Sequence, residues 1–180
     1  TWLHANLKGH PGIWMAPIKE IHYFDDPSPG RLITRAFADS QPRKKARTRR
    51  LLRMEGRQLR KLRGERLMWW LRFVFQRRSD QWYRGLFSPG PGQIAGEVTP
   101  EYAPLEERVV ARIHALMPRA RIIYLLRIPI HRAWSQAAMD FSKYGHRGLH
   151  TIGDEEIKAF LEGGRVSKHS NYVKNLQAWE

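Results

Sequence analysis

The chain has 180 residues, of which 42% are apolar, which suits one domain with a buried core and excludes wholesale disorder. Its 32 Lys and Arg against 17 Asp and Glu give a net charge of +15, which favours negatively charged partners such as nucleotides, acidic glycans, anionic lipid or nucleic acid. Cysteine is absent and neither a membrane-spanning apolar run nor a secretory signal is visible, which excludes disulfides and cysteine nucleophiles and predicts a cytoplasmic protein.

The N-terminal part of the chain predicts short elements separated by glycine and proline. Residues 1–7 have a helical pattern, which ends at the sequence GHPG, residues 9–12. The segment KEIHYFD, residues 19–25, alternates apolar and polar side chains as a short strand or extended edge does. This alternation places Glu20 and His22 on one face, about 7 Å apart along the chain.

A long run of helix-forming residues over 43–78 is dominated by lysine and arginine. Leu52, Leu59 and Leu62 give it a thin apolar stripe. We interpret the segment from about 41 to 78 as a basic helical insertion in a single domain that spans the chain. The plain interpretation is a solvated arginine-rich face over a strip of core. The alternative is a docking surface for an acidic glycan or for membrane phospholipid, with the protein then membrane-associated.

The C-terminal part predicts strands that alternate with helices. Ser79 and Asp80 are suited to cap a short helix, and the sequence SPGPG breaks the chain after it. The elements expected beyond that break are a strand in 92–98, a helix over 104–116, a strand over 121–126, a helix over 130–144 and two helices around Gly163-Gly164. The strand over 121–126 lacks alternation, as strands covered on both faces do. The order therefore predicts an α/β fold of three layers, with a mostly parallel sheet flanked by helices.

A phosphate site is expected where the strand over 121–126 gives way to its helix. Ligands of open α/β sheets bind at the carboxyl ends of strands, and Arg127 stands at such an end. The following helix offers free backbone N–H groups, Pro129 fits its first turn, and Ser135 adds a hydroxyl. The alternative that these residues leave open is an arginine in a structural salt bridge or facing solvent.

Four stretches of the chain resemble, in the same order, motifs of sulfotransferases that use 3′-phosphoadenosine-5′-phosphosulfate (PAPS). The stretches are TWLHANLKGHPGIWMAPIKEIHYFD (1–25), GEVTPEY (96–102), LLRIPIHRAWS (125–135) and SNYVKNLQAWE (170–180). The family motifs are T-x-x-L-x-x-x-L-x-x-HP with KE-x-HYF, GE-x-TP-x-Y, LR-x-P-x-x-R-x-x-S and a Y-x-x-x-L-x-x-W helix. The KE-x-HYF form is similar to the bacterial and heparan-type carbohydrate branch more than to the small-phenol branch.

On the donor side, the resemblance implies a P-loop-NTPase-like sulfotransferase fold that binds PAPS as co-substrate, with no metal. Arg127 and Ser135 would hold the 3′-phosphate of the donor. Thr1 would be the last threonine of the loop that holds the 5′-phosphosulfate. The rest of that loop and a strand would stand before Thr1, and a further strand would follow Glu180. We therefore expect a domain incomplete at both ends, an internal fragment that is inactive when isolated.

On the acceptor side, the resemblance implies that Glu20 is the general base and that His22 is a second catalytic residue. Asp25 and Tyr102 would contact the acceptor, which is expected to be a hydroxyl or amino group of a carbohydrate. Val98 departs from glycan-acting relatives, which often carry lysine at that position of GE-x-TP. From the residues alone, Glu20 would be a surface acid paired with a neighbouring cation, and His22 a partly buried histidine bonded to backbone.

Two other functions stay open at this point. A nucleic-acid-binding protein would use the arginine-rich helix and its interleaved aromatic residues. A relative of P-loop nucleotide kinases would share the sheet and the phosphate chemistry but needs a complete P-loop with lysine. The order of the four motifs favours the sulfotransferase and predicts no specific nucleic-acid partner.

Overall fold

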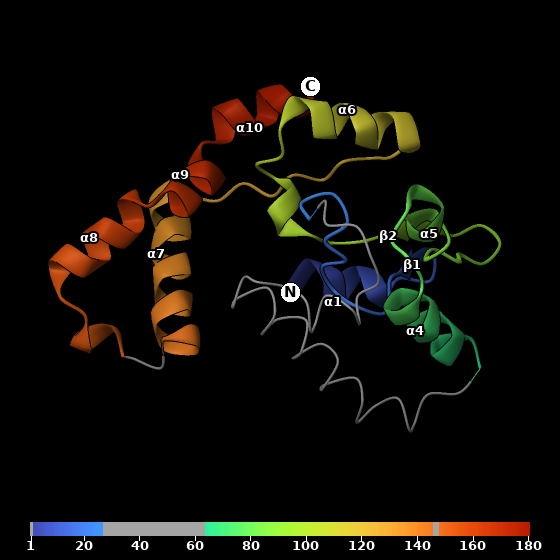
Figure 1. The fold of residues 1–180 in the computed structure, drawn as a ribbon, viewed down its shortest axis with the longest axis horizontal. Helices are drawn as coiled ribbons and strands as arrows, with labels where there is room; N and C mark the ends of the chain where they lie inside the picture. The colour runs from blue at the N-terminus through green and yellow to red at the C-terminus, as the bar shows by residue number, and fades with distance from the viewer. Residues whose placement is uncertain (1, 27–63, 146–147) are drawn as a thin grey trace. The chain divides into compact units, whose positions relative to one another are not determined.

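The computed structural model describes residues 2–26, 64–145 and 148–180, and these residues form an α/β protein (Figure 1). The chain divides into two compact units, with the boundary between Pro100 and Glu101, and each unit is described by itself. Most of the predicted basic insertion lies outside the described residues. Among the described helices, none is both long and apolar enough to cross a bilayer.

The first unit is built around a pair of parallel strands. Its described elements are α1 (Trp2–Lys8), β1 (Ile13–Met15), α4 (Glu65–Phe75), α5 (Asp80–Arg84) and β2 (Ile94–Gly96). Ile13 lies opposite Ile94 and Met15 opposite Gly96 in the ladder. The helix expected near the N-terminus and the strand expected within 92–98 are therefore confirmed.

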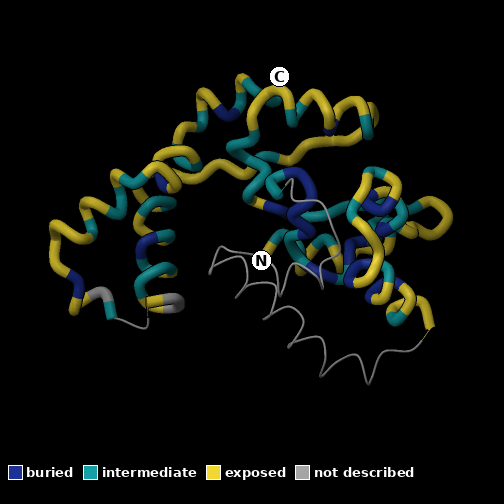
Figure 2. The backbone as a smooth tube through the Cα atoms, in the orientation of Figure 1, coloured by how far each residue is buried: buried dark blue, intermediate teal, exposed yellow. Residues whose placement is uncertain are grey.

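The core of the first unit is largely aromatic, and it fixes the loop that follows β1. Helix α4 buries Trp69, Trp70, Phe73 and Val74, whose spacing places them on one face of the helix (Figure 2). From the loop, Tyr23 stacks on Tyr83 of α5 with ring centroids 4.9 Å apart, and Phe24 meets the same ring edge-on. The loop is thus part of the core rather than a surface connection.

The cap expected at the start of α5 is present. The Ser79 hydroxyl accepts a hydrogen bond from the backbone N–H of Trp82 at 3.1 Å, which satisfies one donor of the first helical turn. The capped helix then buries Trp82 and Tyr83 against the aromatic core. The start of α5 is held close to the loop after β1, because Tyr23 donates its hydroxyl to Asp80 at 2.6 Å.

The second unit is helical in its described residues. Its elements are η1 (Pro100–Tyr102, across the boundary), α6 (Glu107–Leu116), α7 (Pro129–Met139), the π-helical turn η2 (Asp140–Tyr144), η3 (Leu149–Thr151), α8 (Asp154–Glu162), α9 (Gly164–Ser170) and α10 (Tyr172–Trp179). Helices α7, α8 and α9 contact one another, and α10 contacts α6 (Figure 1). The Trp179 indole ties the end of α10 to the carbonyl of Ala103 at 3.2 Å.

Residues 121–128 precede α7 without forming the strand expected over 121–126. Their apolar side chains are exposed: Ile123 by 64%, Leu125 by 63% and Leu126 by 60%. A segment becomes a strand only when a neighbouring strand satisfies its N–H and C=O groups. In the described ranges, β1 and β2 pair with each other alone. The described residues therefore form an α/β structure with a two-stranded parallel sheet.

Candidate functional site

The carboxyl ends of β1 and β2 bring two of the sequence motifs together. Because the strands are parallel, KEIHYFD after β1 and GEVTP, which begins at the last residue of β2, lie at the same end of the ladder. Backbone hydrogen bonds continue beyond the strands: Ala16 N–H donates to the Gly96 carbonyl at 3.2 Å, and Glu20 N–H donates to the Val98 carbonyl at 3.1 Å. The backbone of Val98 thus holds Glu20 in place, whatever side chain stands at position 98.

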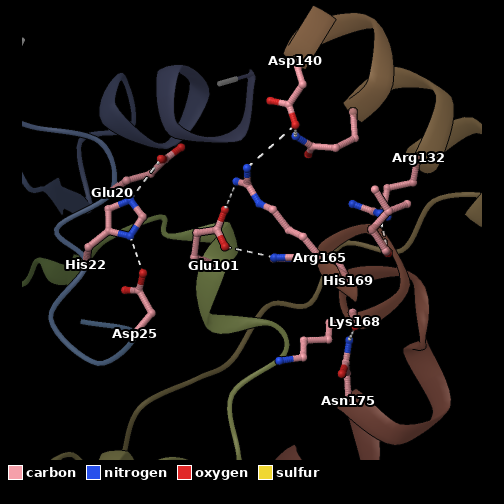
Figure 3. Close-up of polar contacts among 12 residues, drawn as sticks. Glu20, His22, Asp25, Glu101, Arg132, Asp140, Arg165, Lys168, His169 and Asn175 are labelled. Carbon is pink, nitrogen blue, oxygen red and sulfur yellow. Dashed lines mark hydrogen bonds and ion pairs between the residues drawn. The ribbon is translucent and has the colours of Figure 1, made fainter. Parts of the chain in front are cut away.

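Glu20, His22 and Asp25 form one hydrogen-bonded array after β1 (Figure 3). Nδ1 of His22 lies 2.6 Å from Oδ2 of Asp25, and Nε2 lies 3.2 Å from Oε2 of Glu20. An imidazole with a carboxylate oxygen at each ring nitrogen can donate to both only when it is protonated. The side chain of His22 is 5% exposed, that of Asp25 18% and that of Glu20 32%, so Glu20 is the member of the array most open to a solute.

The array is made by a turn rather than by the short strand or extended edge expected over 19–25. Glu20 has φ 66° and His22 has φ 54°, which is the left-handed region that residues other than glycine rarely occupy. Each such residue costs about 1–3 kcal/mol and persists only where its surroundings hold it. The turn brings the side chains of Glu20 and Asp25 to opposite edges of one imidazole ring. In a flat strand, Glu20 and His22 would lie side by side on one face, but the His22 ring would not lie between the two carboxylates.

The pairing of Glu20 with a neighbouring cation, expected from the residues alone, is present, whereas Glu97 was not singled out from the sequence. The Lys19 ammonium contacts Oε1 of Glu20, so each oxygen of Glu20 has a polar neighbour. Glu97 accepts hydrogen bonds from the hydroxyl groups of Tyr83, at 2.5 Å, and Thr99, at 2.8 Å. Lys19 belongs to the KE-x-HYF motif and Glu97 to the GE-x-TP-x-Y motif. This membership was the sequence signal that could have pointed to both residues. Lys19 is placed to meet an anion near Glu20, whereas Glu97 ties the GEVTP segment to α5.

Arg127 and Ser135 are hydrogen-bonded to each other at the start of α7, and their role as ligands of one phosphate stays a prediction. Nη1 of Arg127 donates to Oγ of Ser135 at 3.2 Å, and both residues are exposed. The first backbone N–H groups of α7, at Ile130 and His131, precede the first intrahelical hydrogen bond, and Pro129 has no N–H to satisfy. A guanidinium, a hydroxyl and the positive end of a helix dipole form a donor set suited to a phosphate.

The second arginine of the LLRIPIHRAWS motif, Arg132, serves the packing of α7 on α9. Its Nε donates to the Ser170 hydroxyl at 2.9 Å, and its Nη2 donates to the Val166 carbonyl at 2.8 Å. Burial lowers the pKa of the Arg132 guanidinium, which still remains charged. Arg132 therefore helps to orient the helix whose N-terminus carries the donor set.

Two further residues expected at the site have no described role in it. Thr1 lies outside the described residues, so its contact with a 5′-phosphosulfate stays a prediction. Tyr102 ends η1 and is half-buried, and its carbonyl accepts the N–H of Leu105 at 3.2 Å. Its contact with an acceptor also stays a prediction.

A cluster of charges around Glu101 stabilises the second unit (Figure 3). Glu101 is hydrogen-bonded to Nε2 of His169 at 3.0 Å and accepts from Nη2 of Arg165 at 2.8 Å. Arg165 also lies 3.9 Å from Oδ2 of Asp140. The bond to His169, aided by that to Arg165 and opposed by burial, lowers the pKa of Glu101 from 4.5 to about 2.

Glu101→Gln is expected to lower the free energy of unfolding by about 1–2 kcal/mol at pH 7. Because its folded pKa is depressed, the carboxylate stabilises the fold above about pH 4.5, and this contribution is lost as the pH falls towards 2. The full shift would correspond to about 3 kcal/mol, which solvent screening reduces because the side chain is 31% exposed. Urea unfolding at several pH values, followed by circular dichroism, measures the effect.

The matched control for this prediction is Glu106→Gln. Glu106 pairs with Arg108 at 2.8 Å, but both side chains are largely exposed, so its loss should leave the unfolding midpoint unchanged. Wild type and Glu101→Gln should become equally stable near pH 2. A difference between them that is the same at pH 7 and near pH 2 would contradict the predicted linkage.

The described residues thus carry two polar sites, the array around Glu20 in the first unit and the donor set at the start of α7 in the second. In the part of the chain that the structure describes, no group of three or more His, Asp and Glu side chains is arranged to hold a metal ion. No family model, curated protein or solved structure matches this chain. The functional assignment therefore rests on the residues and on the geometry of the two sites.

Proposed function

We propose that this protein is a sulfotransferase that moves a sulfuryl group from PAPS to a hydroxyl or amino group of a carbohydrate. The observation that carries the proposal is the Glu20–His22–Asp25 array at the carboxyl end of the parallel strand pair. The Arg127–Ser135 pair at the start of α7 supports it. Both sites fall on motifs that resemble those of the PAPS-dependent family.

Glu20 acts as the general base in the proposed reaction. Its carboxylate takes the proton of the acceptor O–H or N–H while the acceptor atom attacks sulfur. The bond from sulfur to the 5′-phosphate oxygen breaks, and 3′-phosphoadenosine-5′-phosphate (PAP) leaves with the electron pair. Sulfuryl transfer resembles phosphoryl transfer, where positioning and electrostatics supply most of the catalysis. The partial exposure of Glu20 gives an acceptor access to it.

His22 and Asp25 orient the base. With Asp25 at one ring nitrogen and Glu20 at the other, the His22 ring keeps the Glu20 carboxylate from rotating away from the acceptor. A base held in one orientation is more effective because a proton transfer requires a short, aligned contact. Lys19, in contact with the second Glu20 oxygen, offers a cation to the negative charge of the transferring group.

The donor is proposed to bind through its 3′-phosphate at Arg127 and Ser135, with Thr1 at its 5′-phosphosulfate. The positive end of the α7 dipole adds to the attraction. The proposed fold has three layers and is related to that of P-loop NTPases, and the parallel pairing of β1 with β2 supports it.

The acceptor is proposed to be a carbohydrate, and an acidic glycan suits the net charge of +15. The KE-x-HYF motif is similar to that of the glycan-acting branch. The nucleic-acid alternative depends on the arginine-rich run before residue 64, which lies outside the described residues, so no described contact favours it.

The direct test is transfer of radiolabel from PAPS by the full-length gene product. The acceptors are desulfated heparan sulfate, an amino-sugar oligosaccharide and p-nitrophenol. We expect label on a glycan, release of an equal amount of PAP, and no label on p-nitrophenol. Absence of label on every acceptor, together with absence of PAP binding, would remove the proposal.

A further inference from the structure

We infer that Arg78 is a positioning residue that holds the left-handed backbone at His22, and through it the contact between His22 and Glu20. The inference deepens the proposed function and rests on it for its catalytic consequence. Arg78 stands between α4 and α5, more than fifty residues beyond the array in the sequence. It lies in none of the four motifs.

The buried side chain of Arg78 binds the loop that carries Glu20, His22 and Asp25. Its Nη2 donates a hydrogen bond to the carbonyl oxygen of His22, and its Nη1 lies 3.7 Å from Oδ2 of Asp26. The side chain is 5% exposed, so water does not compete for these contacts. The guanidinium carbon lies 5.5 Å from the ring centroids of both Tyr23 and Trp82. Arg78 is therefore fixed by two parts of the unit, the loop after β1 and helix α5.

A buried arginine is unfavourable unless its charge and donors are satisfied. Arg78 contacts the carbonyl oxygen of His22 and the carboxylate of Asp26, and its guanidinium lies near the rings of Tyr23 and Trp82. Tyr23 is itself tethered through its hydroxyl to Asp80. The guanidinium fork reaches a carbonyl and a carboxylate at the same time, which the single ammonium of lysine cannot do in the same plane.

The left-handed conformation of His22 explains why its carbonyl needs the hydrogen bond from Arg78. A histidine at φ 54° persists only where the surroundings over-determine it. If His22 relaxed to an extended φ, the carbonyl would turn away from Arg78 and the ring would leave the gap between Glu20 and Asp25. The Glu20 N–H bond to Val98 holds the first left-handed residue, and Arg78 holds the second. The buried Arg78 thus helps to keep His22, and through it the general base Glu20, in the observed orientation.

The test compares Arg78→Met, which keeps an unbranched apolar stem without the guanidinium, with Arg78→Lys, which keeps the charge. Arg77→Met is the matched control, because Arg77 is the exposed neighbour and its loss removes the same charge. The readouts in the full-length gene product are kcat and KM for transfer to desulfated heparan sulfate, PAP affinity, and the imidazole nitrogen resonances of His22. A His22→Gln spectrum assigns these resonances.

We expect Arg78→Met to lower kcat by about 10- to 100-fold, since a small displacement of a catalytic group has an effect of that order. The KM for PAPS and the affinity for PAP should stay within about twofold, because the donor set at α7 is untouched. The His22 resonances should move in Arg78→Met, recover only in part in Arg78→Lys, and stay in place in Arg77→Met.

Unchanged kcat and unchanged His22 resonances in Arg78→Met would overturn the inference. So would an equal loss of kcat and PAP affinity, which would indicate general structural damage. If Arg78→Met does not fold, Arg78→Lys decides: wild-type kcat with unmoved His22 resonances overturns the role, and a lowered kcat with moved resonances supports it. If the wild-type protein transfers no sulfuryl group, the proposed function fails, while the His22 resonances still show whether Arg78 positions the ring.

Discussion

Arg127→Ala is expected to weaken the binding of PAP by about 10- to 100-fold and to abolish the thermal protection that PAP gives the wild-type protein. A hydrogen bond to a charged group contributes about 1.5–3 kcal/mol, and each 1.4 kcal/mol is a tenfold change in affinity. Arg127 is exposed and its described partner is the Ser135 hydroxyl, so its removal leaves no buried charge behind. Calorimetric titration and thermal unfolding with and without PAP measure the two effects.

The nucleotide itself supplies the sharpest control for this prediction. Adenosine 5′-phosphosulfate lacks the 3′-phosphate, so its affinity should be the same in Arg127→Ala and in the wild type. Arg121→Ala removes another exposed arginine from the same segment and should leave the affinity for both nucleotides unchanged. Ser135→Ala should weaken PAP less than Arg127→Ala does, because a hydroxyl is a neutral donor. Retained PAP protection in Arg127→Ala, or an equal loss for both nucleotides, would remove the 3′-phosphate assignment.

Glu20→Gln is expected to lower the rate of sulfuryl transfer by about 10²- to 10⁴-fold while PAP binding is retained. The amide has the size and shape of the carboxyl group but cannot accept the acceptor proton. The measurement is kcat with radiolabelled PAPS and desulfated heparan sulfate, paired with calorimetric titration of PAP.

Glu65→Gln is the control for loss of a carboxylate in the same unit, since Glu65 is exposed in the first turn of α4. Its kcat should equal that of the wild type. Full activity in Glu20→Gln would refute the role of base. A parallel loss of PAP affinity in Glu20→Gln would instead assign Glu20 to donor binding.

Local spacing in the sequence was enough to predict several elements, and the resemblance to a family pointed to Glu20, His22, Arg127 and Ser135. The cap at Ser79 and the proline in the first turn of α7 depend on neighbours within a few residues. The members of the two sites, Glu20 with His22 and Arg127 with Ser135, are also separated by only two and eight residues. Such pairs can be predicted because one element or one turn carries both members.

Only the tertiary structure decided how these residues meet. The left-handed backbone at Glu20 and His22 overrode the alternation that indicated a strand, because a carbonyl bonded by Arg78 and an N–H bonded to Val98 hold it. Residues 121–126 have the composition of a buried strand, yet a strand also needs a partner, and no described strand pairs with them. Backbone conformation at these places depends on contacts between residues far apart in the chain, which no local pattern encodes.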